Sequence, residues 1–222
     1  MPLPSKYSRS AVVIALFAIA FFVTGVWQLQ DQIVDDGFIF IRLAQNFADG
    51  HGIVWNVGEQ ATEGATNFLH FIALSALLVC GIEPVLASLV LSSACAVLIF
   101  FLVTRGLREK LGPMLPAGMA ILAIFMVDER ITINAAARGL GSLIDGLAAV
   151  CVWLAANRQL KSPTAKNAIA LGVIAFITCI ARPTGALFTA VVYAVLLVNA
   201  LLEFGTDKSR LRAWSIAAGI TA

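Results

Sequence analysis

The sequence predicts an all-α, polytopic membrane protein, and three observations support this fold class. Of the 222 residues, 60% are hydrophobic and only 13% are charged, and the mean hydropathy is +0.92. Such a composition leaves too few polar side chains to cover a soluble globule. The apolar residues also gather in separate runs without alternation of period two. In lipid only helices and closed barrels satisfy the backbone, so these runs are expected to be helices.

Composition also excludes several function classes. The net charge of +2 is small and the basic residues are scattered, so no nucleic-acid partner is expected. The four cysteines each lie inside an apolar run without a short paired spacing, which favours packing over a disulfide framework or a zinc site. His51 and His70 lack the HExxH spacing of a zinc helix.

The first apolar run, residues 11–27, follows two basic residues and has no small-residue cleavage site after it. We interpret it as an uncleaved signal anchor with a cytoplasmic N-terminus. Further apolar runs cover 68–82, 85–104, 113–127, 140–156, 168–181 and 186–204, and a last one covers 213–222. The chain ends about ten residues into that last run, so we expect a partial span and a product truncated at its C-terminus.

The charged loops decide which runs cross the membrane. If every run crossed once, the basic segments 105–110 and 157–166 would face outward, against the positive-inside rule. Both become cytoplasmic if residues 68–82 do not cross. That run would span only about 22 Å, less than the roughly 30 Å of a hydrocarbon core, although it could still cross a thinned bilayer. We therefore expect one transmembrane module with an outer loop at 28–84 and two juxtamembrane helices, 36–48 and 68–82.

The first juxtamembrane helix is amphipathic. Phe40, Leu43, Ala44 and Phe47 follow the spacing of one helical face, and we expect this face to lie in the lipid and the polar strip to face the loop above. Gly50 and Gly52 are expected to end the helix, and residues 56–58 to form a turn.

The acids at the start of this helix admit two interpretations. Asp35 and Asp36 can cap the helix and complement its dipole. A carboxylate at an apolar boundary can instead act as a general base toward an acceptor hydroxyl. Arg42, two turns further on, either snorkels to headgroup phosphates or clamps one lipid-linked phosphate. Both pairs of interpretations stay open on spacing alone.

The stretch from Asp35 to His70 resembles the first extracytoplasmic loop of the GT-C superfamily of polyprenyl-phosphate-sugar-dependent glycosyltransferases. The closest likeness is to actinobacterial terminal arabinofuranosyltransferases and their bacterial relatives. The loop motif of that family is matched in register by Asp35, Asp36, Phe38, Ile39, Arg42, Ala44, Asn46, Gly50, Gly52, Val54, Asn56, Gly58, Glu59, Glu63, Gly64, Thr66, Asn67, Phe68 and Leu69. The segments RGLGS (138–142) and IARPTG (180–185) are similar to two further family motifs.

The resemblance implies a GT-C transmembrane module and assigns roles to residues. Asp35 or Asp36 would be the catalytic base or a ligand of a divalent cation such as Mg²⁺, Mn²⁺ or Ca²⁺. Arg42 and Arg182 would contact the donor phosphate, although Arg182 before Pro183 could also be an interfacial anchor at a helix kink. His51, Glu63, Asn67 and Arg138 are candidates for substrate binding, although a structural role is the favoured interpretation for the first three taken singly.

The sequence departs from the family at two glutamates, which are replaced by Gly141 and Thr184. Asp145, or the pair Asp128 and Glu129, could supply the missing carboxylate. The family members are also several hundred residues longer.

The resemblance therefore predicts inverting transfer of a sugar, such as arabinofuranose or another pentose or hexose, from a polyprenyl-phosphate donor. The acceptor would be a cell-envelope glycan, lipid or protein, and the site would lie on the outer face of a bacterial cytoplasmic membrane. The alternatives are a non-catalytic binder of the lipid-linked sugar, a translocator, or an inactive truncated relative. A translocator is less favoured because only Arg182 and Pro183 interrupt an apolar run.

Overall fold

The computed structural model describes residues 5–62, 64–202 and 219–220, and within these ranges all regular structure is helical. This confirms the all-α prediction. The helices in chain order are α1 (Ser5–Gln28), α2 (Asp35–Ala48), α3 (Phe68–Val79), α4 (Pro84–Leu111), the 3₁₀ turn η1 (Gly112–Met114), α5 (Leu115–Val127), the π-helical turn η2 (Glu129–Ile133), α6 (Asn134–Ala137), α7 (Ser142–Lys161), α8 (Ala165–Ala181) and α9 (Pro183–Leu202).

The longer helices coincide with predicted runs, and several extend further, whereas η2 and α6 lie between two predicted runs. α4 continues through the basic segment 105–110, with Arg108 and Lys110 in its last turn, where cations complement the negative end of the helix dipole. α7 likewise ends with Arg158 and Lys161. α3 is shorter than expected because Gly81 adopts a positive φ of 80°. The run expected at 213–222 lies outside the described residues except for 219–220.

Two helical stretches, Arg9–Gln28 and Pro84–Val127, are long and apolar enough to cross a membrane. A third is added if the pair Glu129–Ala137 and Ser142–Lys161, bent by 110°, counts as one span. Helices α8 and α9 are apolar but shorter. Two or three membrane-spanning helices are thus supported by length and composition in the described part of the chain, against the six complete spans that the apolar runs predict.

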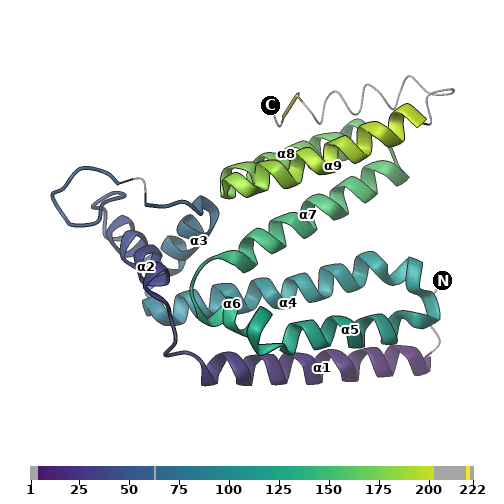
Figure 1. Ribbon diagram of the computed structural model, residues 1–222, viewed down its shortest axis with the longest axis horizontal. Helices are drawn as coiled ribbons and strands as arrows, with labels where there is room; N and C mark the ends of the chain where they lie inside the picture. Colours follow the sequence, from purple (N-terminus) through teal and green to yellow (C-terminus); the bar gives the residue numbers. More distant parts are fainter. Residues whose placement is uncertain (1–4, 63, 203–218, 221–222) are drawn as a thin grey trace. The chain divides into compact units, whose positions relative to one another are not determined.

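The chain divides into two compact units. The first unit comprises Met1–Ala65 and His70–Ile144, and the second comprises Thr66–Leu69 and Asp145–Ala222. In the first unit, α1, α4 and α5 lie side by side (Figure 1), because η1 turns the chain back after α4. Phe22 of α1, Phe100 of α4 and Met119 of α5 are buried together in its larger core.

A second core of the first unit holds α2. Phe40, Leu43 and Ala44 are buried against Phe71 of α3 and Ala87 of α4. The expectation that this apolar face lies in the lipid is therefore wrong for these three residues. A hydrophobic period of 3.6 residues shows that one face of a helix will be buried, but it does not show whether lipid or protein covers that face. Here two neighbouring helices cover it.

The second unit contains α7, α8 and α9, with Val152, Leu171 and Leu196 in its core. α8 and α9 lie side by side (Figure 1) and are separated by one extended residue, Arg182, with φ −161° and ψ 149°. Pro183 begins α9, where its missing N–H and fixed φ are tolerated. The expected helix kink is thus a complete break. It places the Arg182 side chain at the end of the α8–α9 pair.

Candidate functional site

The candidate site of the first unit is the start of α2. Val34 is the N-cap residue and no side chain caps the helix, so the predicted capping hydrogen bonds of Asp35 and Asp36 are not present. Both carboxylates lie in the first turn and are exposed. There they still complement the positive end of the helix dipole. Neither makes a hydrogen bond or ion pair with the described residues, so both remain available to a ligand.

Two motifs that are about a hundred residues apart in sequence meet at this turn. Gly37 packs so tightly against the backbone carbonyl of Arg138 that a β-carbon there would overlap its oxygen. Gly139 in turn lies against the Cα of Gly37. Arg138 itself is exposed at the end of α6. The backbone of the RGLG segment therefore packs directly on the helix turn that carries the two acids.

His70, near the start of α3, lies at the same place. The imidazole has 1% exposure and lies edge-on to Phe40 of α2, with ring centroids 5.4 Å apart. Burial lowers the pKa of His70 to about 4, and the backbone of Gly139 only partly offsets this. His70 is therefore neutral at physiological pH and links α3 with α2.

Arg42 and Asn46 hold the loop that follows α2. Arg42 donates from Nε to the carbonyl of Trp55 at 2.8 Å and from Nη2 to Oδ1 of Asn56 at 2.9 Å. Asn46 donates from Nδ2 to the carbonyls of Val54 and Trp55 at 2.7 and 3.1 Å. The polar strip of α2 thus faces the loop, as predicted. Arg42 is already engaged by protein groups, so the predicted phosphate contact would use its remaining N–H groups.

A separate candidate site lies in the second unit, around Asp145 in the first turn of α7. Arg182 Nη1 lies 3.4 Å from Asp145 Oδ2. Asn67 Nδ2 donates to both carboxylate oxygens, at 2.9 and 3.0 Å. Asn67 is buried with 1% exposure, whereas the Arg182 and Asp145 side chains are 45% and 22% exposed.

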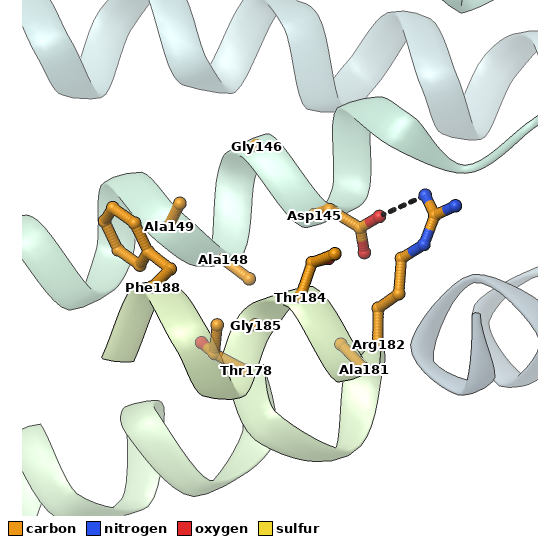
Figure 2. Close-up of a pocket in the computed structure, with 10 residues that line it drawn as sticks. All are labelled: Asp145, Gly146, Ala148, Ala149, Thr178, Ala181, Arg182, Thr184, Gly185 and Phe188. Carbon is orange, nitrogen blue, oxygen red and sulfur yellow. Dashed lines mark hydrogen bonds and ion pairs between the residues drawn. The ribbon is translucent and has the colours of Figure 1, made fainter. Parts of the chain in front are cut away.

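A cavity of about 270 Å³ opens beside this cluster. Figure 2 shows Asp145 and Arg182 directed at each other near one end of the cavity, with Thr184 beside them and Phe188 further along. The remaining lining is made of small residues, among them Gly146, Ala148, Ala149 and Gly185. The cavity therefore combines a charged end with an otherwise apolar wall.

The backbone explains one departure from the family motif. Gly141 adopts a φ of 71°, a left-handed conformation that is unfavourable for residues with a β-carbon. A glutamate in this backbone would be strained, and the nearest acid, Asp145, follows one turn later. Of the other candidates, Asp128 caps η2 by accepting from the N–H of Ile131 at 2.9 Å. Asp145 is therefore better placed than Asp128 to stand in for the missing glutamate.

The remaining predicted residues differ in what surrounds them. His51 is exposed directly after α2, and its backbone N–H donates to the carbonyl of Asn46 at 2.9 Å. Glu63 lies outside the described residues.

The sequence did not reveal that Asn67 binds Asp145, since the two lie 78 positions apart. The one sequence feature that could have suggested this contact is that Asn67 lies in the loop motif and Asp145 lies close to the segment 138–142.

The described residues contain no group of three or more His, Cys, Asp or Glu side chains placed to hold a metal ion. Asp35 and Asp36 alone would offer two carboxylates. This donor set suits Mg²⁺, which is often bound through one or two carboxylates together with water and substrate phosphates. A cation here would depend on the substrate for its remaining ligands.

Comparisons of the chain with protein-family models, with curated proteins and with solved structures find no match. The function is therefore argued from the geometry of the two candidate sites, one in each unit, and from the sequence motifs they contain.

Proposed function

We propose that this protein is a membrane glycosyltransferase that moves a sugar from a polyprenyl-phosphate donor to a cell-envelope acceptor on the outer face of the cytoplasmic membrane. The observation that carries the proposal is the packing of Arg138 and Gly139 on Gly37. It joins the DDG and RGLG motifs, each of which resembles the GT-C family, at one exposed pair of carboxylates.

In the proposed reaction, the oxygen of an acceptor hydroxyl attacks the anomeric carbon of the donor sugar. The bond from that carbon to the phosphate oxygen breaks, and polyprenyl phosphate leaves with the electron pair. Asp35 or Asp36 takes the hydroxyl proton, a role that requires an ionised carboxylate without a competing partner. Attack opposite the leaving group inverts the anomeric configuration.

The developing charge on the phosphate needs stabilisation more than protonation. In the first unit, the backbone of Arg138 packs on the turn that carries the two acids, and its side chain is exposed. Arg42 of the same unit retains N–H groups that the loop does not use. Arg182 belongs to the second unit, where it makes one long contact with Asp145, and is a separate candidate for holding an anionic group. A divalent cation held by whichever of the two acids is not the base would supply further charge when bound.

The test is sugar transfer by the chain in reconstituted membranes, with radiolabelled polyprenyl-phosphate pentoses and hexoses and with envelope glycans as acceptors. The proposal predicts a labelled product whose new bond is inverted, as determined by NMR. If folded protein binds a donor but transfers from none of them, the chain is a non-catalytic binder and the proposal is wrong.

A further inference from the structure

Trp55 lies in the loop that Arg42 and Asn46 hold on α2. It is a large apolar side chain, yet 40% of it is exposed. The Arg42 guanidinium lies over the ring, 5.2 Å from its centroid, within the range of a cation–π contact. One ring face is therefore occupied by Arg42, and the rest of the indole is open.

The loop around this ring is fixed by many polar contacts. Beyond the bonds from Arg42 and Asn46, the backbone N–H of Thr62 donates to the carbonyl of Ile53 at 2.9 Å, which closes the loop at its base. Asn56 Nδ2 donates to Oε1 of Glu59 at 2.9 Å, and Gly58 completes the turn with a φ of 90°. The backbone that carries the indole is thus held in place, and the ring rests on Arg42, so a ligand needs to order less of this loop on binding.

The chemistry next to the ring narrows the class of ligand. Arg42 lies over the ring and is hydrogen-bonded to Asn56, which in turn donates to Glu59, so polar side chains follow Trp55 on the same loop. A sugar ring has the matching character, because its C–H groups form an apolar face and its hydroxyls form a polar rim. A hydrocarbon chain would leave these polar groups without partners.

The position of the ring along α2 fits the proposed chemistry. Arg42 is seven residues from Asp35, about 10 Å along the helix axis and on nearly the same face. An oligosaccharide acceptor could rest one ring on Trp55 and present a hydroxyl of another ring to the acids at the helix start.

We propose that Trp55, backed by Arg42, is a stacking platform for a sugar ring of the substrate. The assignment of this sugar to a substrate rests on the proposed function. The sugar could belong to the acceptor glycan or to the lipid-linked donor, and the two sources are separated by experiment.

The experiment uses a chain in which Trp27, Trp153 and Trp214 are replaced by Phe, so that Trp55 is the only tryptophan. This protein in nanodiscs is titrated with linear oligosaccharides of arabinose, mannose, galactose and glucose, and separately with short-chain prenyl-phosphate sugars. We expect a saturable change in Trp55 emission with at least one sugar, and the arm that produces it identifies the source.

A second measurement compares affinities for the sugar that responds. In the otherwise native chain, Trp55→Ala should weaken binding roughly tenfold or more, Trp55→Phe should retain much of it, and Trp27→Ala should leave it unchanged. The proposal is overturned if no sugar changes the emission, if Trp55→Ala binds as tightly as the native chain, or if brominated lipids in the nanodisc quench Trp55, which would make it a membrane anchor. Because these readouts measure binding, absence of transfer with intact binding would count against the proposed function alone.

Discussion

The contacts of Asp145 lead to a quantitative prediction about which of its two partners matters for stability. The Asn67 amide is buried and donates two short hydrogen bonds to a charged carboxylate, an arrangement worth about 1.5 to 3 kcal/mol. The Arg182 contact is longer, at 3.4 Å, and its guanidinium is nearly half exposed. Solvent screening limits such a pair to about 0.2 to 1 kcal/mol.

Double-mutant cycles measure both couplings. The free energy of unfolding in detergent is determined for Asp145→Ala, Asn67→Ala, Arg182→Ala and the two double variants that include Asp145→Ala. We expect a coupling of about 2 kcal/mol between Asp145 and Asn67, and about 0.5 kcal/mol between Asp145 and Arg182. The cycle removes contributions that Asn67 makes elsewhere. A coupling to Arg182 equal to or larger than that to Asn67 would refute the reasoning.

Three further predictions concern the first unit. Burial holds His70 neutral in the folded protein, with a pKa near 4. As pH falls, the unfolded chain therefore takes up the proton first, and about 2 kcal/mol of stability should be lost between pH 7 and pH 5. The free energy of unfolding measured at both pH values checks this, and the loss should be smaller in His70→Gln. Gly37→Ala should destabilise the protein by about 1 to 3 kcal/mol because the new β-carbon meets backbone atoms. In Gly118→Ala the β-carbon meets only the flexible end of Leu111, so this variant should be tolerated. Equal melting temperatures of the two variants would contradict this prediction. Arg42→Lys should release the loop after α2, since lysine lacks the guanidinium fork; hydrogen exchange at residues 53–59 should rise, and unchanged protection would show that Asn46 suffices.

Local features of the helices could be predicted from the sequence. The spacing of Phe40, Leu43 and Ala44 placed α2 within one residue of its observed start, because a helical period is a property of neighbouring residues. The partner of that apolar face could not be predicted. It is formed by α3 and α4, and an interfacial helix facing lipid would show the same pattern.

The candidate site was predictable only in part. The two acids and the three motifs were recognised as sequence patterns, yet the packing of Arg138 and Gly139 on Gly37 depends on a chain reversal that no local pattern encodes. Asp145 was one of several candidate carboxylates. We prefer Asp145 to Asp128 because of the left-handed backbone at Gly141 and the hydrogen bonds from Asn67. Both features are known only from the structure.

The most direct test of the central claim is the rate of sugar transfer from the polyprenyl-phosphate donor in Asp35→Asn and Asp36→Asn, each compared with the native chain. Asp49→Asn is the matched control, since Asp49 is an exposed acid at the other end of the same helix. We predict that one of the two variants loses roughly 10²- to 10⁴-fold in turnover, the contribution typical of a general base, while Asp49→Asn transfers normally. Turnover unchanged in both variants would contradict the assignment of the base to this pair.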